Sequence, residues 1–157
     1  MSVPPSVTKT TKDGLKITSS VDRCAYTIRE LTRAALRDVG KFVCIKSNMA
    51  AQKLFYGGLG KAKSKRVKGI SKKGAFQYWV RPRECDLQVA VTHETWYGIE
   101  QELGTGKMKK KGILTASVYS NIADIIKIES LYLSALENEA EALSLISEKG
   151  YGREDEE

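Results

Sequence analysis

The sequence predicts an α+β fold: an N-terminal helix, a small antiparallel sheet of three to four strands, and a long C-terminal helix packed on one face of that sheet. Three observations predict it. Apolar residues recur every three or four positions in residues 21–54 and again in residues 113–147, as they do in amphipathic helices. Strand-like segments with short connections lie between these two stretches, which favours antiparallel pairing. No internal repeat is visible.

Residues 1–20 leave two interpretations open. An Asp-Gly pair between β-branched segments favours a short hairpin, because this pair suits the tight turns that join antiparallel strands. Two prolines near the N-terminus instead favour a flexible arm. We expect residues 21–147 to form a single α+β domain and residues 148–157 to form a loose acidic tail.

The first helix is expected to start at Ser20 or Asp22, either of which can cap a helix. Gly40 weakens the helical pattern but does not end it. The glycines of "YGGLG", residues 56–60, end it firmly, since glycine accepts the left-handed conformation that terminates helices.

The segment that follows, residues 61–75, carries seven lysines and arginines and no acid. Such a run repels itself and has little apolar surface to bury, so we expect an exposed basic loop.

Strands are predicted at residues 76–82 and 86–92, whereas residues 95–103 suit either a strand or a short helix. The last helix is predicted from residue 113 to residue 147. Its core-facing stripe is expected to include Ile122, Ile126, Leu133 and Leu136.

Composition excludes several classes of protein. The chain has 157 residues, 41% hydrophobic and 29% charged, which is ordinary for a globular domain. No apolar run approaches the roughly 20 residues of a membrane helix, and the N-terminus lacks the apolar core of a signal peptide. We therefore expect cytosolic synthesis and no membrane contact.

Charge is distributed unevenly along the chain. The net charge is +7, yet residues 128–157 contain nine acids and two bases, which leaves 24 bases and 10 acids in residues 1–127. A chain polarised in this way suits electrostatic docking onto another protein or onto a copy of itself.

The three cysteines, Cys24, Cys44 and Cys85, lack CxxC spacing, and His93 is the only histidine. No metal site is therefore predicted, and the cysteines are expected to be small buried residues, reduced in the cytosol.

Catalytic patterns are weak throughout. His93 and Glu94 would point to opposite faces of a strand, which places them poorly as a base and its orienting partner. Glu100 and Glu102 would share one strand face, but no other acid nearby completes a site. The glycines of "GGLG" and "GTGK" lack the spacing and the Ser/Thr of a phosphate loop. We predict a protein that is not an enzyme and that has no catalytic residue, cofactor or metal.

An alternative prediction is a basic nucleic-acid-binding protein. Residues 61–75 and the lysines of residues 107–111 can neutralise phosphates. Phe76, Tyr78 and Trp79 can stack on bases. Against this prediction, aromatic residues in a central strand are more often core, and no known nucleic-acid-binding signature is present.

Residues 97–105 carry a more specific pattern, Tyr-small-x-x-x-Glu-apolar-Gly-Thr, which is met by Tyr97, Gly98, Glu102, Leu103, Gly104 and Thr105. It resembles the family of tailed-phage head–tail joining proteins, also called tail-completion or neck proteins. The family's next element, Pro-aromatic-Leu-Arg-Pro-Ala, is only echoed by "GILTAS", residues 112–117, in which Leu114 matches. The family's Pro-x-x-Thr-Gly segment after the first helix is absent.

The resemblance implies a structural subunit of a phage or phage-tail-like particle, located in the virion at the head–tail interface and assembled in the host cytoplasm. It implies a homo-oligomeric ring, expected to be six-fold, next to other neck, tail-terminator or tail-tube proteins, with non-specific contact to DNA in the lumen. The basic body and the acidic C-terminal segment are expected to pair between adjacent subunits. The predicted interface residues are Lys61, Lys63, Lys65, Arg66, Lys68, Lys72, Lys73, Tyr97, Glu102, Gly104, Thr105, Lys107, Lys109, Lys110, Lys111, Glu137 and Glu141.

Overall fold

The structure is a computed structural model that describes residues 3–56, 74–81, 83–95 and 97–149. It is an α+β fold, as the sequence predicts. Its elements in chain order are β1 (Val7–Thr10), β2 (Lys16–Ser19), α1 (Val21–Tyr56), β3 (Phe76–Arg81), β4 (Asp86–Val91), the 3-10 turn η2 (His93–Thr95), α2 (Tyr97–Leu103), α3 (Ile113–Ser120), α4 (Ile122–Ser134), the 3-10 turn η3 (Ala135–Glu137) and α5 (Glu139–Lys149).

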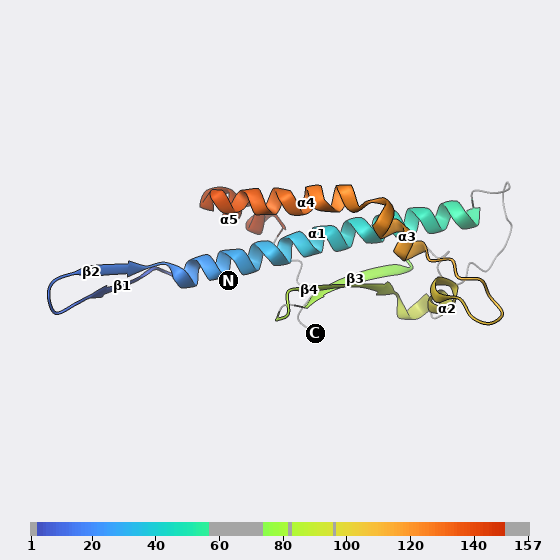
Figure 1. The fold of residues 1–157 in the computed structure, drawn as a ribbon, viewed down its shortest axis with the longest axis horizontal. Coiled ribbons are helices and arrows are strands. Elements are labelled where there is room, and N and C mark those ends of the chain that lie inside the picture. The colour runs from blue at the N-terminus through green and yellow to red at the C-terminus, as the bar shows by residue number, and fades with distance from the viewer. Residues whose placement is uncertain (1–2, 57–73, 82, 96, 150–157) are drawn as a thin grey trace.

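The long helix α1 is the axis of the molecule. The β3–β4 hairpin packs along one side of it and α4 with α5 along the other, while β1–β2 extends beyond its N-terminal end (Figure 1). The helix runs through Gly40 without interruption for 36 residues. Asp22 in its first turn and Lys53 in its last complement the helix dipole.

The β3–β4 hairpin turns its apolar face to α1. Phe76 pairs with Val91, and Tyr78 pairs with Val89, so these side chains share one face of the hairpin. Phe76 is buried in a cluster whose members are Cys44, Ala51, Ala75, Phe76 and Ile113. Alternation of apolar and polar residues, visible in the sequence, is what creates this one-sided hairpin.

Gly40 allows the hairpin to approach α1 closely. A β-carbon at this position would lie 2.5 Å from Cδ2 of Tyr78 and 2.9 Å from Cδ1 of Leu87. The glycine that the sequence pattern presents as a weakness in the helix is therefore the point at which the sheet crosses it.

A second cluster joins α1 to α4 and α5. Leu31 and Ala34 pack with Tyr132 and Ala142, all four of them buried. The Tyr132 hydroxyl donates a hydrogen bond of 2.7 Å to Oδ2 of Asp38 on α1. Burial, with this bond to a carboxylate, raises the pKa of Tyr132.

Two structural expectations are wrong, and one open alternative is resolved. In place of one sheet of three to four strands, the described residues form two separate two-stranded sheets, β1–β2 and β3–β4. Residues 97–103 are the helix α2 rather than a third strand, so the short-helix alternative is the one confirmed. The predicted C-terminal helix is broken at Asn121 and again at residues 135–138, and its longest part packs on α1. It packs there because the small β3–β4 hairpin already covers the opposite side of that helix.

The prediction of three buried cysteines is confirmed for Cys44 and wrong for the other two. Cys44 lies in the core, but Cys24 and Cys85 are exposed, and all three thiols are free. Cys85 stands in the turn between β3 and β4 with a left-handed φ of 49°. Cys24 is exposed in the first turn of α1.

Candidate functional site

The motif residues lie around a loop that connects α2 to α3, residues 104–112, which we call the lysine loop. Gly104 opens it with a φ of +80°, and a β-carbon there would lie 2.8 Å from the backbone nitrogen of Lys110. Both the backbone angle and the close approach require glycine. The loop is closed further by backbone N–H groups of Lys111 and Gly112, which donate to the carbonyl oxygens of Gln101 and Glu102 at 3.0 and 3.2 Å.

Glu102 holds the far end of this loop. Its carboxylate accepts hydrogen bonds from the backbone N–H groups of Ile113 at 2.7 Å, Leu114 at 2.9 Å and Thr115 at 3.2 Å. These are donors at the start of α3 that have no partner within that helix. A buried negative charge at a helix N-terminus is stabilised by the dipole as well as by these bonds. Glu102 therefore joins α2 to α3 and takes the place of a local capping side chain.

The tip of the lysine loop is a tight turn. Thr105 and Met108 exchange backbone hydrogen bonds of 2.9 and 3.1 Å and form a single β-bridge. The turn holds the basic side chains outside the body, where Lys107, Lys109, Lys110 and Lys111 are all exposed.

The motif thus divides between an inner and an outer part. Glu102 and Gly104 build the loop, whereas Thr105 and the lysines lie on its surface. Tyr97 is the first residue of α2. Glu137 and Glu141 are exposed in η3 and α5 at the other end of the molecule. The seven predicted interface residues between 61 and 73 lie outside the described residues.

The predicted acid–base candidates whose side chains the structure describes lie in η2 and α2. His93 is exposed in η2 rather than on a strand, Glu100 is exposed on α2, and Glu102 is fully engaged with α3. Of the aromatic residues considered for base stacking, Phe76 is core, Tyr78 is half-buried against α1, and Trp79 is exposed on the outer face of β3.

Two apolar surfaces were not predicted from the sequence. The first is one face of the β1–β2 hairpin. Lys9 pairs with Ile17, and Val7 pairs with Ser19, so the side chains of one face are Val7, Lys9, Leu15, Ile17 and Ser19. Its apolar members are 46% (Val7), 61% (Leu15) and 52% (Ile17) exposed. The opposite face is polar and includes a hydrogen bond of 3.1 Å between the hydroxyls of Thr8 and Thr18.

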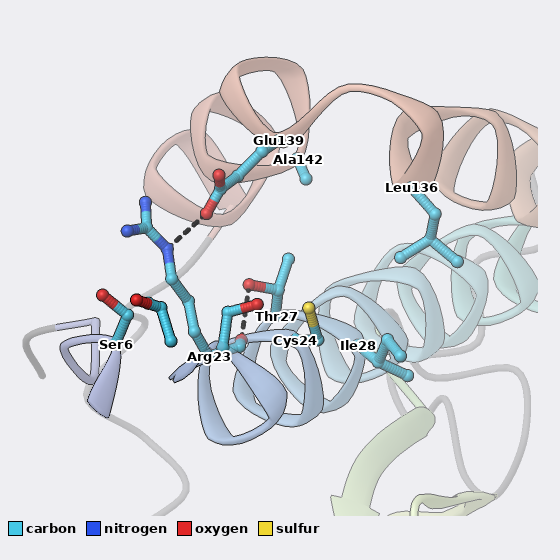
Figure 2. A pocket seen from close by; sticks show the side chains of 10 residues that line it. Ser6, Arg23, Cys24, Thr27, Ile28, Leu136, Glu139 and Ala142 are labelled. Carbon is cyan, nitrogen blue, oxygen red and sulfur yellow. Dashed lines mark hydrogen bonds and ion pairs between the residues drawn. The ribbon is translucent and has the colours of Figure 1, made fainter. Parts of the chain in front are cut away.

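The second surface is an open groove between α1 and α4–α5, which we call the α1–α4 groove. Its wider part has a volume of about 520 Å³ and lies beside the base of the β1–β2 hairpin (Figure 2). Cys24 and Ile28 line it from α1, and Leu136 and Ala142 from the opposite side. At one end Arg23 pairs with Glu139, and Thr27 donates to the Arg23 carbonyl oxygen at 3.0 Å.

The groove continues along α4 into a narrower part of about 200 Å³. Ile28 and Leu136 line both parts, and Leu133 with Glu129 lines the continuation. A groove of this size lies in the range that accepts small ligands. However, the charged pair in its wider part is already joined, and most of the remaining lining is apolar. It offers an apolar surface rather than reacting groups.

The α4 side of this groove belongs to a continuous exposed stripe. Its members follow a spacing of four and three, and they are Ile122, Ile126, Glu129, Leu133 and Leu136. The sequence predicts that the apolar members face the core, but in the single chain they are exposed. Periodicity reveals that a helix has an apolar stripe, but α4 has two adjacent ones, and only the one containing Tyr132 meets α1.

No helix in the described part of the chain is both long enough and apolar enough to cross a membrane. The same residues contain no group of three His, Cys, Asp or Glu side chains arranged to hold a metal ion. Comparison of the chain with protein-family models, with curated proteins and with solved structures found no match.

Proposed function

We propose that this protein is a non-enzymatic structural subunit that assembles with copies of itself into a ring in the neck of a phage or phage-tail-like particle, where it joins the head connector to the tail. The pattern at residues 97–105 resembles that of the neck proteins. The geometry of the lysine loop gives these residues a structural role. Glu102 and Gly104 build a loop that presents lysines at the surface.

The observation that carries the proposal is the amount of ordered apolar surface that the single chain leaves uncovered. One face of the β1–β2 hairpin and one stripe of α4 are each regular, each belong to a defined element, and each are exposed. Scattered exposed apolar residues are normal, whereas contiguous ones mark interaction surfaces. An assembly that covers both surfaces accounts for them together.

Charge supports the same proposal. The lysine loop and the β1–β2 hairpin are basic, whereas η3 and α5 expose Glu137, Glu139 and Glu141. Exposed ion pairs contribute only about 0–1 kcal/mol each. Repeated around a ring, such pairs set the register of neighbours and exclude wrong partners.

Two measurements test the proposal. We expect the purified chain, or the chain within purified particles, to form a ring visible by electron microscopy, with a mass several times 17.4 kDa. Mass spectrometry of purified particles should find the protein among their components. Its absence from particles whose other neck proteins are present would refute the neck assignment.

A second candidate function, binding of nucleic acid, is favoured by one observation: four exposed lysines on the lysine loop. This function predicts DNA affinity that falls steeply with salt. Replacing Lys107, Lys109 and Lys110 by alanine should lower that affinity and its salt dependence, while the Lys9→Ala control should change neither. Equal binding by both variants would dismiss the lysine loop as a DNA contact.

A further inference from the structure

The β1–β2 hairpin lacks the support that such a hairpin needs. An isolated two-stranded hairpin is marginal in water and requires a covered apolar face. Here every residue of both strands is exposed, and so is Leu15, which directly precedes β2 and completes the apolar face. The hairpin extends beyond the end of α1 rather than folding onto it (Figure 1). Its apolar face therefore requires a cover that does not come from the described body of the same chain.

The α1–α4 groove also exposes apolar side chains that the described body of the chain leaves uncovered. Ile28, Leu133 and Leu136 line it and are exposed. The hairpin of the same chain cannot fill it, because its base already forms one end of the groove: Ser6, Thr18 and Ser20 are among the lining residues. Only Ser20 separates β2 from α1, so the tip points away from the groove that lies beside the base.

Charge favours a second copy of this chain as the occupant. The hairpin and its turn carry three lysines and one aspartate, namely Lys9, Lys12, Lys16 and Asp13. The α4–α5 side of the groove is acidic, with Glu129 in the lining and Glu137 and Glu141 exposed nearby in the chain. A basic, one-sided apolar hairpin thus matches an apolar groove whose α4–α5 side is acidic, and each copy carries both.

We propose that the apolar face of the β1–β2 hairpin of one copy docks in the α1–α4 groove of the next copy. This contact deepens the ring proposed above and rests on it. Because the two surfaces differ, the contact is head-to-tail: each copy gives its hairpin to one neighbour and receives one from the other. Such a contact propagates, and it closes into a ring when the rotation between copies allows.

A disulfide cross-link tests the contact directly, because Cys24 already lines the groove. The background variant is Cys85→Ser, which removes the other exposed thiol. Leu15→Cys then places a thiol on the apolar face near the hairpin tip. Leu15 stands four residues along the chain from Ser19, roughly 13 Å for a strand. Because β2 leads away from the N-terminal end of α1 (Figure 1), we expect no bridge to Cys24 of the same chain, which needs α-carbons within about 7 Å.

We expect mild oxidation of this variant to give a ladder of covalent multimers on a non-reducing gel. Adding Cys24→Ser should abolish the ladder and leave at most dimers joined hairpin to hairpin. The matched control is Thr10→Cys, which lies near the tip on the opposite, polar face and should give no ladder.

The outcomes separate this contact from the ring itself. If rings form, by electron microscopy or within particles, but Leu15→Cys gives no ladder, the contact is wrong and the ring proposal stands. The same conclusion follows if Thr10→Cys gives an equal ladder, or if Leu15→Cys joins a different protein in particles. If the chain stays single both in solution and in particles, the proposed function fails and takes this contact with it.

Discussion

The two hairpins of this protein differ in one respect that matters. Each consists of two antiparallel strands with one apolar face, and each adjoins α1. The β3–β4 hairpin buries Phe76 against that helix, whereas the β1–β2 hairpin leaves Ile17 and Leu15 more than half exposed. The same local pattern thus serves once as core and once as surface. What decides the outcome is the position of the hairpin along the chain relative to a helix face.

The two hairpins therefore differ in whether they need a partner to become stable. The packed hairpin is covered by residues of its own chain and contributes to the stability of the monomer. The projecting hairpin contributes little until something covers it, since burial of apolar area supplies most of the stabilisation of a folded domain. Four predictions test how far the packed region and the projecting region differ in stability and exposure.

The largest expected difference is between Phe76→Ala and Ile17→Ala. Phe76 is 5% exposed, and truncating a buried phenylalanine lowers the free energy of unfolding by about 3–5 kcal/mol. Ile17→Ala should change it by no more than about 0.5 kcal/mol, the usual range for surface positions. Chemical denaturation of the monomer measures both. Similar losses would mean that the two hairpins are equally integrated in the fold.

Glu102→Ala should be next in size. It removes three hydrogen bonds at the start of α3 and leaves their donors unpaired, at a cost of about 2 kcal/mol. Because Ile113 belongs to the same core cluster as Phe76, this substitution should destabilise the packed region. The control is Glu100→Ala, an exposed glutamate on the same helix, which should be neutral in thermal denaturation.

Gly40→Ala tests the close approach of the packed hairpin. Alanine favours a helix over glycine by about 1 kcal/mol, which would stabilise the variant. However, its β-carbon would lie 2.5 Å from the Tyr78 ring, and this clash should cost more. We therefore expect the free energy of unfolding to fall by about 1 kcal/mol. For a chain of this length, that loss lowers Tm by roughly 2–4 °C. In contrast, Gly14→Ala strains only the turn of the projecting hairpin, where φ is +78°, and should leave Tm unchanged. A stabilised Gly40→Ala protein would contradict the close contact.

The smallest effect involves no loss of stability but a difference in thiol chemistry. Burial raises the pKa of Cys44 to about 11, so at pH 8 its reactive thiolate is scarce. Iodoacetamide should modify Cys24 and Cys85 in the native monomer and reach Cys44 only after unfolding. In assembled rings Cys24 should become protected while Cys85 stays reactive, as read by mass spectrometry of the modified peptides. Protection of both would place the interface elsewhere.

Much of the local structure could be predicted from sequence. The first helix, its end near residue 56, both hairpins and the turns between their strands follow from periodicity and from Gly, Pro and Asp signals. The break at Asn121 could not be predicted, since α3 and α4 have apolar residues on both sides of it. Nor could the packing of α4 on α1, because it depends on which side of α1 the β3–β4 hairpin occupies.

The candidate site was predicted only in part. The pattern around Glu102 and Gly104 pointed to the right loop, but burial of Glu102 could not be foreseen, because its partners are backbone N–H groups 11 to 13 residues away. The groove was missed because its lining comes from α1 and α4–α5, more than 100 residues apart in sequence. Its one visible signal was an excess of apolar residues on α4, more than a single stripe requires.

The direct connection between β2 and α1 has a mechanical consequence. Ser20 is the sole residue that links the strand to the helix. Its carbonyl oxygen accepts the first helical hydrogen bond, from the N–H of Cys24 at 2.9 Å, so no flexible linker separates the two elements. A helix of 36 residues spans roughly 54 Å, and α1 therefore acts as a ruler with the hairpin fixed at one end. Inserting four residues would move the far end by about 6 Å and turn it by about 40°. The length of this one helix consequently sets both the distance and the relative rotation between a partner bound at the hairpin and a partner bound at the opposite end.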